Sequence, residues 1–70
     1  MTVYIRGIEM PGSVKGVTVE DINGDYNVYV NTVLCPEARD RTYRHELKHI
    51  ELNHFHDYNP VIINELEASV

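Results

Sequence analysis

Hydrophobic and polar residues alternate along the first thirty residues and then follow a helical period. The alternation over Thr2–Ile8 predicts a strand, which Pro11-Gly12 ends. Residues 17–22 and 25–30 alternate again and flank Asn23-Gly24, a dipeptide that favours a two-residue hairpin turn. This part of the chain therefore predicts a small antiparallel sheet of about three strands.

A two-residue turn determines which side chains of the hairpin share a face. In that register Val19 lies opposite Val28, and Val17 lies opposite Val30. The other face then carries polar and aromatic side chains, namely Thr18, Glu20, Asn27 and Tyr29. A sheet with one apolar face is expected to be covered by a helix on that side only.

A long helix is expected next, from Pro36 to about His54. Pro36 suits a first helical turn, and Glu37 complements the positive end of the helix dipole. The side chains expected to face the sheet are Ala38, Tyr43, Leu47, Ile50 and Phe55. After a break that ends at Pro60, residues 61–68 predict a short second helix. The predicted fold class is α+β, with the sheet packed on the long helix.

The length of 70 residues predicts one small domain, residues 1–70, whose core supplies only about 3–5 kcal/mol. Cys35 is the only cysteine, so an intramolecular disulfide is excluded. We expect its thiol to be buried or to cap the long helix. A bound metal ion is therefore the available source of extra stability.

The net charge of the chain limits the classes of molecule that it is expected to bind. A net charge of −5 at pH 7 repels phosphate backbones, so nucleic acid is not an expected partner. Residues 1–9 contain Arg6 and Glu9 and lack the apolar core of a signal peptide. No apolar run approaches the roughly 18 residues of a membrane span. We therefore expect a cytoplasmic protein without a membrane partner.

The segment His45-Glu46-Leu47-Lys48-His49 matches the HExxH pattern of zinc hydrolases. Residues four apart lie on one face of a helix, so His45 and His49 can bind one ion. Glu46 then stands beside the metal, where a carboxylate acts as a general base. The pattern predicts one catalytic Zn²⁺ ion. The plainer alternative is a solvated helix with two surface histidines.

A third ligand is expected from the end of the chain. Glu65 and Glu67 follow His49 by 16 and 18 residues, and either would complete a His₂Glu site with one open position. Glu65 borders an apolar stripe that includes Ile62 and Leu66, which favours it slightly. Glu67 stays as the alternative ligand. Each glutamate is otherwise an ordinary solvated carboxylate.

Four segments carry a resemblance that extends over nearly the whole chain: Lys15-Gly16, Tyr26–Asn31, Arg41–Ile50 and Asn64–Ala68. In these segments the chain resembles the ImmA/IrrE family of gluzincin metallopeptidases, small proteins frequent on phages and mobile elements. The resemblance implies an endopeptidase whose substrate is a protein, such as a helix-turn-helix repressor of a mobile element.

The resemblance also implies roles for single residues. Zinc would lie on His45, His49 and Glu65, because in gluzincins the ligand glutamate stands three residues before a small alanine. Glu46 would be the base. Ser69 stands where the family often has Asn, Asp or His, four residues after the ligand glutamate, and would support a ligating side chain less strongly.

Two further side chains are candidates for contact with the reacting groups. Tyr58 could donate a hydrogen bond to a tetrahedral intermediate, and His54, together with His56, could reach the cleft. The simpler alternative for Tyr58 is that it packs in the turn. The simpler alternative for the two histidines is that they are exposed to solvent.

Two other functional classes compete with the hydrolase. One is a degenerate zincin that keeps zinc for stability and binds a protein partner, as an antirepressor or a toxin–antitoxin component. The other is an interaction domain without metal. Glu46 favours the hydrolase, because a purely structural zinc site has no need of a base.

Overall fold

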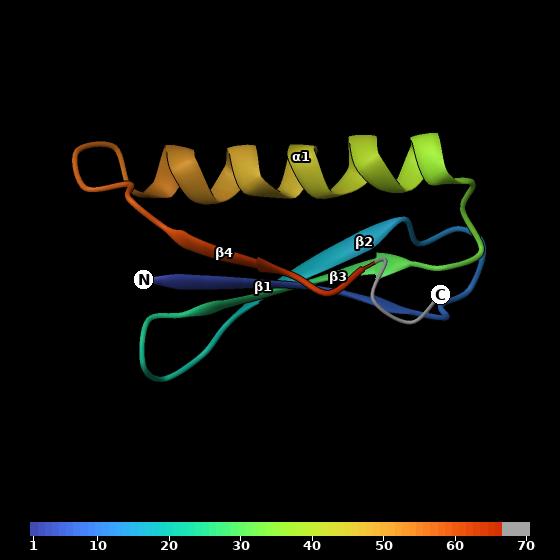
Figure 1. The fold of residues 1–70 in the computed structure, drawn as a ribbon, viewed down its shortest axis with the longest axis horizontal. Helices are drawn as coiled ribbons and strands as arrows, with labels where there is room; N and C mark the ends of the chain where they lie inside the picture. The colour runs from blue at the N-terminus through green and yellow to red at the C-terminus, as the bar shows by residue number, and fades with distance from the viewer. Residues whose placement is uncertain (67–70) are drawn as a thin grey trace.

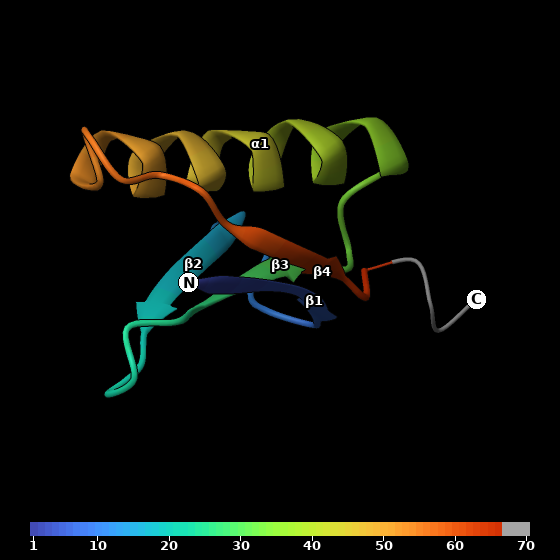
Figure 2. The same cartoon turned by 60° about the vertical axis from the view of Figure 1, so that its left-hand side comes forward.

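The computed structural model describes residues 1–66 and has two layers, a sheet and a helix that lies across one of its faces (Figures 1 and 2). The elements in chain order are β1 (Thr2–Ile8), β2 (Gly16–Glu20), β3 (Tyr26–Asn31), α1 (Pro36–Asn53) and β4 (Val61–Asn64). The α+β class, the first strand, the hairpin and the long helix are thereby confirmed.

The sheet is mixed rather than antiparallel. Its strand order is β2-β3-β1-β4, and only β2 and β3 run antiparallel, whereas β1 is parallel to both β3 and β4. The expected antiparallel sheet of about three strands is therefore wrong in strand number and direction. The reason lies in burial: Val3 and Ile5 are fully buried, so β1 takes a central place with a neighbour on each side.

The predicted second helix is wrong, because residues 61–64 form β4. This strand pairs with β1 from Val61 opposite Thr2 to Asn64 opposite Ile5. Three consecutive β-branched residues, 61–63, explain the result, since such side chains lose rotamer freedom in a helix and fit a pleated strand. The last part of the predicted helix, residues 67 and 68, lies outside the described residues.

The hairpin turn has three residues, 22–24, rather than two. The N–H of Asp21 donates to the carbonyl of Asp25 at 2.8 Å, and Gly24 takes the positive φ of 81° that such a loop requires. Val17 consequently lies opposite Tyr29 and Val19 opposite Asn27. The predicted register is wrong by one residue, which moves Val17 and Val19 to the face of the sheet away from α1.

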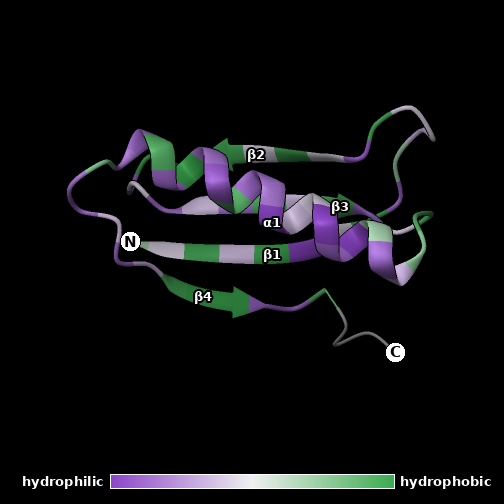
Figure 3. Cartoon of the chain, turned by 90° about the horizontal axis from the view of Figure 1, so that it is seen from above, coloured by the Kyte–Doolittle hydropathy of each residue, from purple (hydrophilic) through white to green (hydrophobic). Residues whose placement is uncertain are grey.

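The core lies between the sheet and α1, which crosses the strands obliquely (Figure 3). Its buried apolar members are Val3, Ile5, Tyr26, Val28, Val30, Ile50 and Leu66. Tyr43 and Leu47 pack against this cluster as expected. Phe55 does not, because α1 ends at Asn53 and leaves the ring 80% exposed.

Cys35 occupies the N-cap position of α1, but its thiol is exposed and makes no cap hydrogen bond. The expectation of a buried or capping thiol is therefore wrong. Among residues 1–66, no helix has the length and apolar character that crossing a membrane requires.

Candidate functional site

The two histidines of the HExxH segment meet on one exposed face of α1. The Nε2 atoms of His45 and His49 are 3.0 Å apart, and the rings are nearly perpendicular, with centroids 4.5 Å apart. The helical period produces this arrangement, because it places residues four apart one above the other.

The distance between these nitrogens fits a shared divalent cation. Two imidazoles on a tetrahedral zinc ion, with Zn–N of about 2.0–2.1 Å, have their nitrogens about 3.3–3.4 Å apart. The 3.0 Å separation of the His45 and His49 Nε2 atoms is within a few tenths of an ångström of this value. The same distance also suits an N–H···N hydrogen bond when one of the two Nε2 atoms carries a proton; when neither does, the lone pairs repel unless a cation lies between them. The pair therefore has the chemistry and the spacing of a zinc ligand pair.

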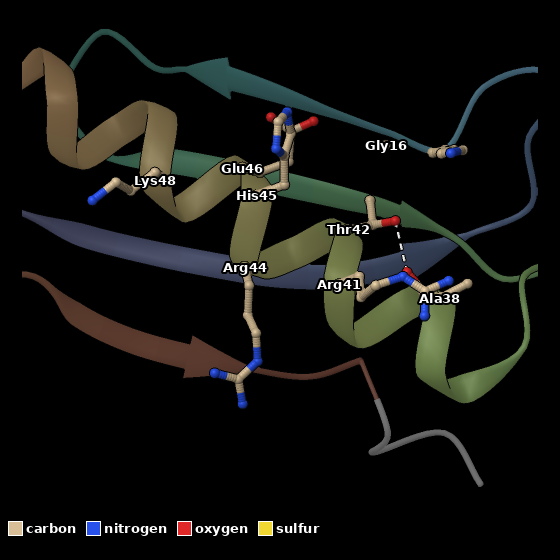
Figure 4. Close-up of a pocket in the computed structure, with 9 residues that line it drawn as sticks. Gly16, Ala38, Arg41, Thr42, Arg44, His45, Glu46 and Lys48 are labelled. Atoms are coloured by element: carbon tan, nitrogen blue, oxygen red, sulfur yellow. Dashed lines mark hydrogen bonds between the residues drawn. The ribbon is translucent and has the colours of Figure 1, made fainter.

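Glu46 faces the sheet rather than solvent. Its side chain is half-buried, and its Oε2 accepts a hydrogen bond of 3.0 Å from the hydroxyl of Thr18 on β2. Figure 4 shows Glu46 and His45 leaving α1 on the side of β2. The carboxylate thus joins the HExxH helix to the edge strand, in the same pocket lining as His45.

An open pocket of about 730 Å³ lies between α1 and the start of β2. Its lining residues are Lys15, Gly16, Ala38, Arg41, Thr42, Arg44, His45, Glu46 and Lys48 (Figure 4). The volume is in the range of ligand-binding clefts. His49 lies one turn beyond His45, next to this lining.

Gly16 is what allows α1 to approach β2 so closely. A Cβ at this position would lie 2.7 Å from Cγ2 of Thr42 and 2.9 Å from the carbonyl oxygen of Tyr29. Thr42 itself is buried, and its hydroxyl donates to the carbonyl of Ala38 at 2.7 Å. The Lys15-Gly16 pair therefore has a structural purpose in forming the pocket wall.

Asn31 holds the loop that leads to Lys15. Its side chain is fully buried, donates to the carbonyls of Met10, Pro11 and Val14, and accepts from the N–H groups of Met10 and Val33. Every one of these partners is a backbone group, so the Asn31 side chain supplies the hydrogen bonds that the loop backbone would otherwise make in a helix or sheet. From the resemblance, Asn31 could either orient the site or join the helix to the sheet; the structure shows that its amide holds the loop.

Within residues 1–66, β2 is an edge strand, and no strand pairs with its outer side. In an antiparallel pair the hydrogen-bonded residues alternate, and the bonds that flank β2 join Lys15 to Asn31 and Asp21 to Asp25. Val17 and Val19 therefore bond to β3. The N–H and C=O groups of alternate residues 16, 18 and 20 therefore point away from β3, at the free edge of the sheet.

Glu65 lies away from the pocket and from the two histidines. It directly follows β4, where its N–H donates to the carbonyl of Ile5 at 2.7 Å, and its Oε2 is 3.4 Å from Nε of Arg6. Side chains alternate along β1, and because Ile5 faces α1, Arg6 is on the opposite face of the sheet. Arg6 is held there by Asn27, whose Oδ1 accepts its hydrogen bond at 2.7 Å, and by the ring of Tyr4.

The structure thus brings His45, Glu46 and His49 together and gives Glu65 a different partner. Within residues 1–66, no group of three or more His, Cys, Asp or Glu side chains is arranged to hold a metal ion. Glu67 and Ser69 lie outside the described residues. The identity of the third ligand stays a prediction.

His54 and Tyr58 have partners away from the pocket. Nε2 of His54 is 2.7 Å from the hydroxyl of Tyr26, and its Nδ1 is 3.4 Å from Oδ1 of Asp57. Tyr58 packs against the core, and this burial, followed by the charge of Glu51, raises its pKa. Their suggested contact with reacting groups stays a prediction, and what the structure shows for both is a structural contact.

Comparison of the chain with protein-family models, curated proteins and solved structures gives no match. Function is therefore inferred from the side chains of α1 and β2.

Proposed function

We propose that this chain is a zinc-dependent endopeptidase that hydrolyses a peptide bond in a protein substrate. The observation that supports it most is the 3.0 Å approach of the His45 and His49 nitrogens beside a glutamate that faces an open strand edge. Surface histidines alone would not require a half-buried carboxylate as a neighbour, whereas hydrolysis requires a base there.

The three specified positions of the HExxH pattern, His45, Glu46 and His49, each have a defined role in this proposal. His45 and His49 hold the zinc ion, which, when bound, supplies the Lewis acid that activates water and polarises a carbonyl. Glu46 accepts the proton of the attacking water and later gives it to the leaving amine. Thr18 holds one oxygen of that carboxylate, which limits its rotation and leaves the other oxygen for the proton.

The edge of β2 is suited to align the substrate. An extended peptide can add to a free strand edge through main-chain hydrogen bonds, and the outward backbone groups of β2 offer such an edge beside Glu46. By resemblance, the substrate would be a helix-turn-helix repressor of a mobile element. Incubation of the zinc-loaded protein with a purified helix-turn-helix repressor, analysed for cleavage, is the corresponding test.

In this proposal Glu65 is the third ligand, so it must leave Arg6. The Arg6–Glu65 contact is long, and the side chains are 38% and 49% exposed. Exposed pairs of this kind contribute roughly 0–1 kcal/mol, which is little compared with a metal–ligand bond. Glu65 would also have to leave the face of the sheet opposite α1, which requires its backbone bond to Ile5 to open and the adjacent core residue Leu66 to move.

A second function is favoured by the Arg6–Glu65 contact itself. If Glu65 stays with Arg6, His45 and His49 bind zinc for stability, and the pocket and strand edge bind a protein without cutting it. The chain would then be a zinc-stabilised binding module, such as an antirepressor or a toxin–antitoxin component.

Metal analysis and one substitution separate the two functions. Protein purified without a His tag is expected to contain one zinc per chain, to lose it in His45→Ala and to keep it in the control His56→Ala, because His56 lies beyond the end of α1, is exposed, and has its ring against that of Phe55. Glu46→Gln should keep zinc and abolish proteolysis. Equal proteolysis by Glu46→Gln and wild type would contradict the endopeptidase, and zinc with partner binding but no proteolysis would support the module.

A further inference from the structure

Basic residues gather around the candidate site although the chain as a whole is acidic. Lys15, Arg41, Arg44 and Lys48 line the pocket, which is four of the six Lys and Arg residues in a chain of net charge −5. Glu46 is the only acidic residue in the lining. The pocket is therefore a local positive region on a negative protein.

Two of these cations are neutralised by neighbours on α1. Arg44 pairs with Asp40 at 2.9 Å, and Lys48 lies 3.5 Å from Glu51. Lys15 and Arg41 differ, because their side chains have no ion-pair or hydrogen-bond partner within residues 1–66. Both are exposed, so they are available to a ligand.

The uncompensated cations lie toward one end of the pocket. Arg41 is one helical turn before His45, and Lys15 directly precedes Gly16 at the start of β2. Figure 4 shows Arg41 and Gly16 on the same side of His45 along α1. A ligand that extends from the histidines toward the start of β2 therefore meets two free positive charges.

We infer that the pocket selects a peptide with acidic side chains on the C-terminal side of the bond to be cut. The inference rests on the proposed function and adds a substrate class to it. A peptide that pairs antiparallel with β2 runs in the opposite direction, so its C-terminal part lies beside Gly16, with Lys15 and Arg41 around it. Asp or Glu carboxylates are the matching groups, since a guanidinium can bind a carboxylate through two parallel hydrogen bonds.

A peptide fits this charge pattern better than a nucleic acid does. The positive region is confined to the pocket, and the edge of β2 ends at Glu20, whose carboxylate repels a continuing phosphate backbone. The outward N–H and C=O groups of β2 match the main chain of a peptide, whereas a nucleic acid offers no such repeat.

The test measures binding to zinc-saturated Glu46→Gln protein, which should not cut the probe. Two fluorescent peptides of about twelve residues are compared by anisotropy, one with Glu at three consecutive positions of its C-terminal half and one with Gln there. We expect at least about five-fold tighter binding of the acidic peptide at low salt, with the difference shrinking at high salt.

Substitutions then assign the preference to named side chains. Arg41→Gln and Lys15→Gln should each weaken binding of the acidic peptide about two- to five-fold and leave the amide peptide unchanged. Lys48→Gln removes a cation that already pairs with Glu51 and should weaken binding of the acidic peptide less than Arg41→Gln does, with circular dichroism to verify the fold. Arg41→Glu should reverse the preference toward a peptide that carries Lys at the same positions.

The outcomes separate this inference from the proposed function. Equal affinity for the acidic and amide peptides, or displacement of the acidic peptide by single-stranded DNA, would overturn the inference. Cleavage of both peptides by wild-type protein with equal kcat/KM would overturn it while keeping the endopeptidase. Preference for the acidic peptide without any cleavage would keep the inference and contradict the endopeptidase instead.

Discussion

The hydroxyl of Thr18 donates a hydrogen bond of 3.0 Å to the carboxylate of Glu46, across 28 residues of sequence. Thr18 also points its backbone groups toward the free edge of β2. One residue therefore contacts the proposed base with its side chain and offers main-chain hydrogen bonds to a substrate. This couples the position of a bound peptide to the position of the base.

Replacing Thr18 by valine should impair catalysis while zinc stays bound. Valine keeps the shape of threonine but cannot donate to Glu46, so the carboxylate gains freedom to rotate away from the reacting water. A hydrogen bond to a charged group is worth about 1.5–3 kcal/mol, and we expect kcat to fall about ten-fold. Steady-state kinetics together with zinc content measure this effect.

Thr18→Ser is the matched control for that variant. Serine restores the donor, so its kcat should return close to the wild-type value. If Thr18→Val and Thr18→Ser have the same kcat, the hydrogen bond does not position the base.

Gly16→Ala should destabilise the fold through steric conflict. The new methyl group would lie 2.9 Å from the carbonyl oxygen of Tyr29 and 2.7 Å from Cγ2 of Thr42, so strand and helix must separate. Overpacking of this kind costs about 1–3 kcal/mol of unfolding free energy. Urea denaturation measures it.

Gly12→Ala provides the comparison, because a Cβ at Gly12 would meet no atom within 4 Å. We expect its unfolding free energy to stay within about 0.5 kcal/mol of wild type. Equal stability of Gly16→Ala and Gly12→Ala would show that the approach of α1 to β2 is looser than the structure describes.

The elements that the sequence predicts well are those decided by local pattern. The helix from Pro36 was predicted from its first turn and its periodicity, and Thr2–Ile8 from alternation. The convergence of His45 and His49 also follows from one helical period. Nothing distant in the chain is needed for any of these.

The features that could not be predicted from the sequence depend on contacts between residues distant in the chain, or on the length of a turn to within one residue. Whether residues 61–64 form a helix or a strand depends on the free edge that β1 offers, which the sequence does not display. The hairpin register depends on Asp21, whose carboxylate accepts from the N–H groups of Asn23 and Asp25 and so lengthens the turn by one residue. The Thr18–Glu46 bond follows from that register.

Stability should fall in alkaline solution because three tyrosines have raised pKa values. Burial is the main cause for Tyr26 and Tyr58, and a hydrogen bond with Asp40 is the main cause for Tyr43. A raised pKa means that the folded state holds the phenolic proton more tightly than the unfolded state. The stabilisation is therefore complete below the ordinary pKa of about 10 and is lost as pH rises through the higher folded value.

Tyr26→Phe tests this pH dependence at one position. The variant should lose about 1 kcal/mol near pH 7, because the hydrogen bond to His54 is absent. Above pH 10 its melting temperature should fall less steeply than that of wild type. Parallel slopes for the two proteins between pH 9 and pH 11 would show that Tyr26 does not contribute.

The competition between Arg6 and zinc for Glu65 gives the most direct test of the metal site. If Glu65 binds zinc, Glu65→Gln should lower zinc affinity at least about ten-fold, as measured by competition with a chelating dye. Arg6→Gln should then raise zinc affinity, because it releases the carboxylate from its 3.4 Å contact with the guanidinium. Glu67→Gln distinguishes the alternative ligand. If only Glu67→Gln weakens zinc binding, Glu67 is the third ligand and Glu65 keeps its contact with Arg6. If neither glutamate variant weakens zinc binding, His45 and His49 hold the ion without either carboxylate, and the binding module becomes the better proposal.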